Sequence, residues 1–189
     1  MRIAVVLLAL AATAGSAGAG QRAGVKMADT VNVGGTQLHL NGMGLREATW
    51  LNVDVYVAGL YVEHVSSDPA RLLASDETKL LVLKFKRDVD RDDIAKAWTE
   101  GFKNNATVPY AQLKPSIDQL NAWMPSFKKG DTLTFMYIPG KGVAVDINNQ
   151  RKGVIPGDDF ARSLYSIWLG PKPPGGDLKR ELLGNHPRS

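Results

Sequence analysis

The stretch of sequence that decides the fold runs from Thr132 to Ile147 and reads Thr-Leu-Thr-Phe-Met-Tyr-Ile-Pro-Gly-Lys-Gly-Val-Ala-Val-Asp-Ile. Apolar side chains recur at every second position on both sides of its centre, at Leu133, Phe135, Tyr137, Val143, Val145 and Ile147. A period of two is typical of a β-strand with one buried face. Between the two runs, Pro139 to Gly142 supplies the residues of a reverse turn. The stretch therefore predicts a β-hairpin and, with it, an antiparallel sheet.

Working outward, the same patterns predict further strands and helices along the chain. The expected strands are a hairpin over Val31–Leu40, a strand over Leu51–Val62 with a β-bulge at Gly59, a strand over Leu80–Phe85, and a short edge strand at Val154–Ile155. The expected helices are Asp68–Leu73, one that begins at Asp90, one that follows Pro115 and stops at Pro125, one from Asp158, and Asp177–Leu183. Trp98 and Trp168 fall on the apolar stripes of two of these helices, which predicts that both are core residues. The order predicts an α+β domain in which helices cover an antiparallel sheet.

The first nineteen residues have the plan of a cleaved secretory signal peptide. Arg2 provides a basic start, Ile3 to Ala12 is apolar, and Ala17-Gly18-Ala19 offers the small residues of a cleavage site. A membrane anchor is the alternative, but the apolar run is about ten residues long, whereas a bilayer span needs roughly twenty. We therefore expect cleavage before Gly20 and, in a bacterium, a periplasmic protein. Residues 20–30 are predicted to be a flexible N-terminal segment, residues 31–184 the domain, and residues 185–189 a tail.

Composition excludes several classes of chemistry. The chain of 189 residues has no cysteine and three histidines that are far apart in sequence, so it carries no disulfide framework, thiolate metal site or cysteine nucleophile. We expect no metal and no cofactor. The net charge of +4 is spread without a basic run, which speaks against a nucleic-acid partner. Gly42-Met43-Gly44 lacks the context of a dinucleotide-binding loop and is interpreted as part of a turn.

Arg46 differs from the other charged residues because it lies among small and apolar residues, directly after Gly42-Met43-Gly44-Leu45. A guanidinium that is partly buried there would need an anionic partner. The alternatives are an exposed arginine or an ion pair with Glu47 or Asp54. The sequence pattern leaves these interpretations equally open.

Five segments together resemble one family. They are Asn41–Arg46, Val55–Val62, Lys84–Val89, Gly130–Asp131 with Tyr137–Gly142, and Ser166–Pro171. The chain resembles the bacterial, exported branch of the chalcone isomerase-like proteins over residues 31–184. The resemblance implies an open-faced β-sandwich, a large antiparallel sheet with helices layered on one face and a cleft between the two layers.

The resemblance also suggests site residues. Arg46 matches the arginine that anchors ligands in the family, and Tyr56 falls where the family has a threonine. Ile94 and Gly101 stand where the enzymes of the family carry a tyrosine and an asparagine, so authentic chalcone cyclisation is not expected. Because the plant members that are enzymes close a phenolic ring, whereas other branches look like fatty-acid binders or non-catalytic partners, the fold does not decide the activity.

Three functions follow from these observations. The first is a non-catalytic binder or carrier of an amphipathic carboxylate such as a fatty acid, held by Arg46 at its acidic end and by an apolar cleft along its tail. The second is an isomerase or intramolecular lyase that uses Arg46 and Tyr56 on an unknown periplasmic compound. The third is an interaction module without a small ligand, which would have a filled cleft. The sequence does not indicate an oligomeric state.

Overall fold

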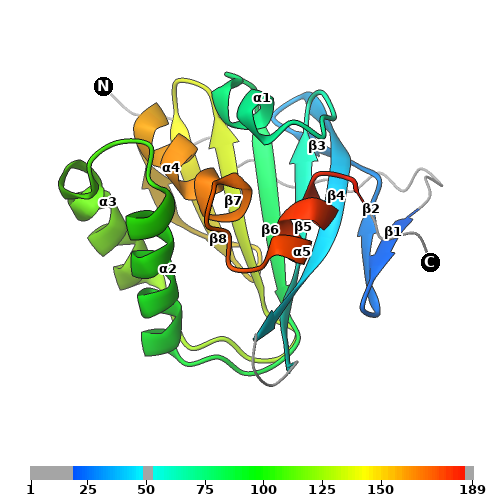
Figure 1. Ribbon diagram of the computed structural model, residues 1–189, viewed down its shortest axis with the longest axis horizontal. Coiled ribbons are helices and arrows are strands. Elements are labelled where there is room, and N and C mark those ends of the chain that lie inside the picture. Colours follow the sequence, from blue (N-terminus) through cyan, green and yellow to red (C-terminus); the bar gives the residue numbers. More distant parts are fainter. Residues whose placement is uncertain (1–18, 49–52, 186–189) are drawn as a thin grey trace, which may run out of the picture.

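The molecule is built on a seven-stranded antiparallel sheet with the strand order β3-β4-β5-β6-β7-β8-β9 (Figure 1). The computed structural model describes residues 19–48 and 53–185. The strands of the sheet are β3 (Thr30–Val33), β4 (Thr36–Ala48), β5 (Val53–Val62), β6 (Lys79–Phe85), β7 (Thr132–Ile138), β8 (Gly142–Ile147) and β9 (Gln150–Ile155). Every neighbouring pair is antiparallel, and β7 and β8 form the hairpin that the alternating sequence predicts.

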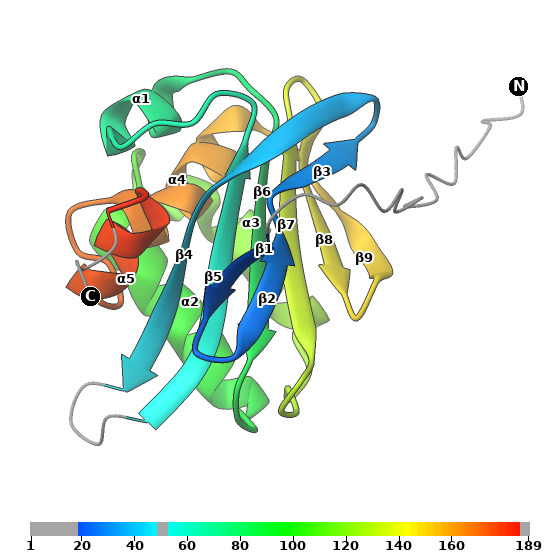
Figure 2. The same cartoon turned by 90° about the vertical axis from the view of Figure 1, so that its right-hand side faces the viewer.

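The helices all lie on one face of this sheet, and the opposite face carries a separate hairpin (Figure 2). The helices are α1 (Pro69–Ala74), α2 (Arg91–Asn105), α3 (Tyr110–Trp123), α4 (Asp158–Leu169) and α5 (Gly176–Leu182). Trp98 of α2 and Trp168 of α4 are both buried between the helices and the sheet, as their positions on the apolar stripes predict. The predicted fold class, an α+β open-faced sandwich, is confirmed. Within the described residues, no helix has the length and apolar character that crossing a membrane requires.

Residues 19–28, which include most of the segment predicted to be flexible, form a hairpin in the structure. They form the two-stranded hairpin β1 (Ala19–Arg22) and β2 (Val25–Ala28), joined by a tight turn in which Ala23 and Gly24 have positive φ. Val25 and Met27 are buried against the face of the sheet that the helices leave open. Two apolar residues are too few to reveal the alternation of a strand in the sequence. In the folded molecule they pack against apolar side chains of the sheet.

Strand β5 is apolar on both faces, which explains the change of phase at Gly59; the prediction of a bulge at that glycine is wrong, because Gly59 pairs regularly with Met43. Tyr56, Ala58 and Leu60 face the core under the helices, whereas Val57 and Tyr61 face the core under the β1–β2 hairpin. The register shows that the extra residue is Asn41 of the neighbouring strand, because Leu40 pairs with Tyr61 and Gly42 with Leu60.

The bulge turns the side chain of Asn41 toward two other segments. Its amide nitrogen donates to the carbonyl oxygens of Ser66 at 3.0 Å and Leu182 at 2.8 Å, and its oxygen accepts from the backbone N–H of Ser66 at 2.7 Å. The extra residue thus fastens β4 to the loop after β5 and to the end of α5.

Two further predictions differ from the structure. Gly42-Met43-Gly44 lies inside β4 and not in a turn, because glycine allows helix α5 to rest directly on this strand. A Cβ atom at Gly42 would lie 2.1 Å from the carbonyl oxygen of Glu181, and one at Gly44 would lie 2.7 Å from the side chain of Leu178. Helix α3 begins at Tyr110, so Pro115 lies within it. The apolar face that starts with Leu113 and continues through Ile117 extends the helix upstream of the proline.

Candidate functional site

The register of β4 and β5 brings the two predicted site residues together. Arg46 pairs directly with Tyr56, and paired residues of antiparallel strands project from the same face. Tyr56 belongs to the core under the helices, so this face is the one that the helices cover. The two residues stand near the ends of their strands, next to residues 49–52, which lie outside the described part of the chain.

Arg46 is partly buried and carries a nitrogen without a partner. Its Nη1 atom is buried and has no hydrogen bond with any described residue. Among the ion pairs of residues 19–48 and 53–185, none involves Arg46, so neither Glu47 nor Asp54 neutralises it there. A buried guanidinium nitrogen without an acceptor is costly, and an anion from outside the chain would satisfy it.

Tyr56 has a buried hydroxyl group that accepts a hydrogen bond. Its hydroxyl oxygen accepts a hydrogen bond from Nε1 of Trp168 at 3.0 Å, so its own proton remains available. Burial raises the pKa of Tyr56 to about 12, although the hydrogen bond from Trp168 and the positive charge of Arg46 act in the opposite direction. The hydroxyl therefore keeps its proton across the physiological pH range. Arg46 and Tyr56 therefore both present hydrogen-bond donors, and neither side chain carries a negative charge that would repel an anion.

The space between the sheet and the helices next to this pair is filled by aromatic side chains. The rings of Phe85 and Phe127 are stacked with centroids 4.2 Å apart, and the ring of Phe85 meets that of Tyr56 edge to face. Trp98 and Trp168 lie against one another with centroids 5.6 Å apart. An aromatic layer of this kind agrees with the filled cleft that an interaction module would have.

The two positions at which the resemblance implies polar residues in the enzymes of the family are both packed against apolar side chains. Ile94 is buried in the core. A Cβ atom at Gly101 would lie 2.9 Å from the side chain of Ile167, which shows how closely α2 approaches α4. Apolar packing thus surrounds both positions at which the resemblance implies polar groups in the enzymes.

Helix α5 is held over β4 by a partly buried ion pair. Arg22 of the N-terminal hairpin donates to the carboxylate of Glu181 from Nε at 3.0 Å and from Nη2 at 2.5 Å. Glu181 also accepts from the backbone N–H of Leu45 at 3.0 Å. Because Arg22 and Glu181 are 159 residues apart, no local pattern indicates this pair.

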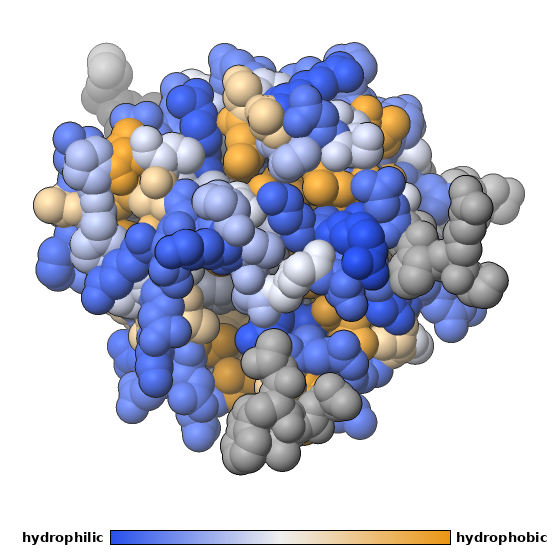
Figure 3. All heavy atoms as spheres, viewed as in Figure 1, coloured by the Kyte–Doolittle hydropathy of each residue, from blue (hydrophilic) through white to orange (hydrophobic). Residues whose placement is uncertain are grey.

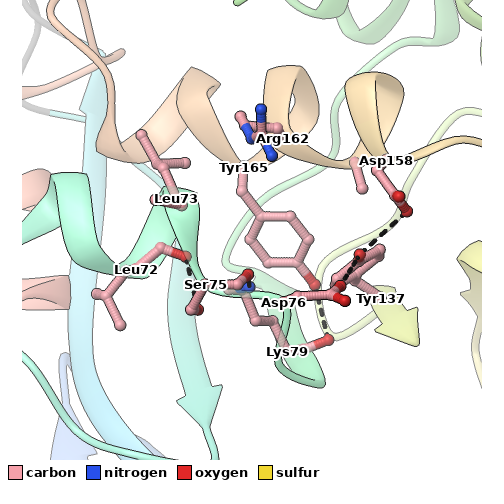
Figure 4. A pocket seen from close by; sticks show the side chains of 11 residues that line it. Leu72, Leu73, Ser75, Asp76, Lys79, Tyr137, Asp158, Arg162 and Tyr165 are labelled. Atoms are coloured by element: carbon pink, nitrogen blue, oxygen red, sulfur yellow. Dashed lines mark hydrogen bonds between the residues drawn. The ribbon is translucent and has the colours of Figure 1, made fainter. Parts of the chain in front are cut away.

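A second candidate site, which the sequence analysis also missed, lies at the other end of the sheet (Figure 4). It is a cavity of about 270 Å³ between α1, the first residues of β6, the end of β7 and α4. Its charged and hydroxylic lining residues are Ser75, Asp76, Lys79, Tyr137, Asp158, Arg162 and Tyr165. The one signal for it in the sequence is a lysine at the head of the apolar run Leu80–Phe85.

Comparisons with known proteins agree with the fold. Residues 19–184 match the model of a family described as chalcone isomerase-like. Among solved structures, the chain is similar to a fatty-acid binding protein of Arabidopsis thaliana, with a TM-score of 0.71 and 17% sequence identity. The alignment covers 89% of this chain and 97% of the plant protein. A search of curated protein sequences gave no match.

Proposed function

Since the chain belongs to the chalcone isomerase-like family, we propose that it binds an amphipathic carboxylate such as a fatty acid. Arg46 pairs with the carboxylate, and Tyr56 donates a second hydrogen bond to it. The family includes several activities on one fold, so the residues at the site carry the proposal. The similarity in fold to a plant protein that is named as a fatty-acid binder supports it.

The observation that carries this proposal is the buried, unpartnered Nη1 atom of Arg46 beside a tyrosine whose proton is free. A guanidinium and a carboxylate form a charge-assisted pair that is about twice as strong as a neutral hydrogen bond. A ligand that supplies the carboxylate removes the cost of burying the unpaired donor. The pair selects an acid over the corresponding alcohol or ester.

The tail of the ligand enters the aromatic layer under the helices. Because Phe85, Phe127 and Trp168 are almost fully buried, the tail displaces aromatic side chains as it binds and replaces their contacts with its own. Each methylene that leaves water contributes about 0.8 kcal/mol. A tail of medium length therefore offsets the rearrangement.

The test is a titration of the full chain with dodecanoate and with dodecanol. Wild type should bind the acid and not the alcohol. Arg46→Ala should weaken the binding of dodecanoate by roughly tenfold to a hundredfold, which corresponds to the loss of about 1.5–3 kcal/mol. Arg46→Lys keeps the charge without the planar fork and should recover part of the affinity.

Arg151→Ala is the matched control, because Arg151 forms an exposed ion pair with Asp146 on the far edge of the sheet and should not affect binding. Equal affinity of wild type and Arg46→Ala for dodecanoate would refute the assignment. Native mass spectrometry of protein purified without detergent adds a second measurement, since a carrier should retain a lipid.

An interaction module without a small ligand is the second candidate, and the filled aromatic layer favours it. In that case the donors of Arg46 and Tyr56 bind an acidic side chain of a protein partner. The two candidates differ in the titration, because the module binds neither dodecanoate nor any other free fatty acid.

We also infer that the chain is exported and cleaved before Gly20, which in a bacterium places it in the periplasm. The basic, apolar and small-residue segments of residues 1–19 support this inference. Cleavage there would leave Arg22 in the mature chain, available for its pair with Glu181. The intact mass of protein from its native host compartment tests the inference, and retention of Met1 in a cytoplasmic fraction would contradict it.

A further inference from the structure

The cavity at the Lys79 end of the sheet has a buried floor and a charged rim. Lys79, Tyr137 and Tyr165 are 3–5% exposed and form the floor. Asp76, Asp158 and Arg162 are exposed and stand at the rim. Polar side chains of this kind also cover much of the helical face, where they surround separate apolar patches (Figure 3). A volume of about 270 Å³ lies below the roughly 300–1,000 Å³ of pockets for drug-sized molecules, so the cavity suits a smaller ligand.

Charges of both signs line this cavity without forming a direct ion pair among the described residues. Lys79 and Arg162 are cationic, and Asp76 and Asp158 are anionic. None of the ion pairs within the described ranges joins a cation of this cavity to one of its carboxylates at 4.0 Å or less. Opposite charges that share a cavity but do not touch can be bridged by a molecule that carries both.

Lys79 supplies the anion-binding part of the cavity. Its Nζ donates to the carbonyl oxygens of Ser75 at 2.6 Å and Glu77 at 3.2 Å, and it lies 5.1 Å from the centre of the Tyr137 ring. An ammonium group has three donors, so one remains after these two bonds. Burial lowers the pKa of Lys79 to about 8, a penalty that nearby acidic residues only partly offset. An anion beside Nζ would compensate the buried charge.

Tyr137 organises the cation-binding part. Its hydroxyl lies 2.8 Å from Oδ1 of Asp76 and 3.1 Å from Oδ1 of Asp158 (Figure 4). A phenol has one proton to donate, so it can satisfy only one of the two carboxylates. The two carboxylates therefore lie close together around one hydroxyl group, and one of them receives no hydrogen bond from it. A ligand ammonium, which brings three donors and a positive charge, fits this surplus.

We propose that the cavity binds a small zwitterion of the amino acid class, with its carboxylate on Lys79 and Arg162 and its ammonium on Asp76 and Asp158. Tyr137 holds the two aspartates in place from below. The site is independent of the fatty acid site, because Lys79 pairs with Val62 and Tyr137 at the end of the sheet away from Arg46 and Tyr56.

The test is a titration of ¹⁵N-labelled full-length protein with glycine, alanine and 4-aminobutyrate, followed by two-dimensional NMR. At least one amino acid should give saturable shifts at residues 72–79 and 158–165. Acetate and methylamine each carry one of the two charges and should bind at least tenfold more weakly. Equal affinity for acetate or methylamine, shifts confined to other residues, or no saturation by roughly 10 mM would overturn the proposal.

Variants test the ammonium-binding and the carboxylate-binding residues separately. Asp158→Asn and Lys79→Met should each weaken binding by about tenfold or more. Asp159→Asn is the matched control, because Asp159 is the next residue of α4, is exposed and does not line the cavity. The affinity of this variant for the amino acid should stay within twofold of wild type. If Lys79→Met does not fold, the exposed Arg162→Gln tests the same half.

Equal affinity of Asp158→Asn and Asp159→Asn would refute the proposed ammonium site. Arg46→Ala should leave amino acid binding unchanged, so this proposal and the proposed fatty acid function can fail separately.

Discussion

The two ends of the sheet, on the same helical face, offer opposite chemical environments. At the Arg46 end, a guanidinium and a phenol present donors next to a packed aromatic layer. At the Lys79 end, two cations and two carboxylates line a cavity that water can enter. The difference follows from the elements above the sheet. Helix α5 rests on β4 and large aromatic rings fill the core at the first end, whereas residues of α1 and α4 line a cavity at the second.

This contrast shows that a tyrosine on the core face of a strand does not by itself indicate a role. Tyr56 and Tyr137 are both buried residues of the same core. The hydroxyl of Tyr56 accepts from an indole, so it can donate to a ligand anion. The hydroxyl of Tyr137 faces two carboxylates, so its proton is already used.

We expect the largest loss of stability from a substitution that displaces α5 from β4. In Gly42→Val, the new side chain would overlap the backbone of Glu181 and Leu182, because even a Cβ atom would lie 2.1 Å from the carbonyl oxygen of Glu181. We expect the free energy of unfolding to fall by about 3 kcal/mol or more, as measured by chemical denaturation.

Gly176→Ala is the control for this variant, because nothing lies within 4 Å of its Cβ position. It should leave the free energy of unfolding within about 1 kcal/mol of wild type. A Gly42→Val protein as stable as the control would mean that α5 does not need to rest on β4.

The next effect tests the ion pair that fastens α5 to the N-terminal hairpin. Arg22→Met should lower the free energy of unfolding by about 3 kcal/mol, because the carboxylate of Glu181 is 1% exposed and would be left buried without its cation. Glu181→Gln should cost less, since Arg22 is 36% exposed and can be hydrated. Thermal and urea denaturation of both variants measure this order. The reverse order would show that the desolvated charge is on the arginine.

A pair of conservative substitutions sharpens the comparison of the two tyrosines. Tyr56→Phe leaves the buried Nε1 of Trp168 without an acceptor and should lower the free energy of unfolding by about 1–3 kcal/mol. Tyr137→Phe should cost about 1 kcal/mol or less, because Asp76 and Asp158 are exposed and water can replace the phenol. Equal costs in denaturation experiments would contradict the difference between the two ends.

The pH dependence of stability reports on Lys79. Its pKa is about 8 in the folded protein and 10.5 in the reference state, so the unfolded chain binds more protons between these values. The free energy of unfolding should therefore rise with pH from about 8 to 10 through this residue. Lys79→Met removes the contribution and should flatten the rise. A wild-type curve no steeper than that of the variant would show that Lys79 is not desolvated.

The smallest expected effect is the absence of chalcone cyclisation at the Arg46 end. Ile94 is buried and Gly101 lies against Ile167, so neither position offers the polar group that the resemblance implies for the enzymes. Loss of chalcone absorbance should proceed at the spontaneous rate with or without protein. A saturable and enantioselective conversion would favour the isomerase or lyase function, with Arg46 as electrophilic stabiliser and Tyr56 as proton donor.

Most of the secondary structure could be predicted because it depends on local periodicity. The alternation in Thr132–Ile147 and the apolar stripes that bury Trp98 and Trp168 are properties of short windows, and both predictions are confirmed. The bulge could not be placed in the same way. Its residue, Asn41, is selected by hydrogen bonds to Ser66 and Leu182, which no window around position 41 contains.

The candidate site residues also differ in whether the sequence indicates them. Arg46 stands out in the sequence as a charge among glycines and apolar residues, and the resemblance to the family pairs it with Tyr56. Whether that arginine is paired or free depends on which side chains surround it in three dimensions. Lys79, Asp76 and Asp158 give no comparable signal, because they come together only through the packing of α1 and α4 on the sheet.

The sequence by itself determined most of the helices and strands and the α+β class, since side-chain periodicity and turn residues act over a few positions. Only the tertiary structure decided that residues 19–28 form a hairpin, that Gly42 and Gly44 carry a helix, and that four charges share a cavity without pairing. The physical reason is that burial and electrostatic pairing depend on distances between segments that are far apart in the chain. Arg22 and Glu181 illustrate this, because 159 residues separate two side chains whose atoms are 2.5 Å apart.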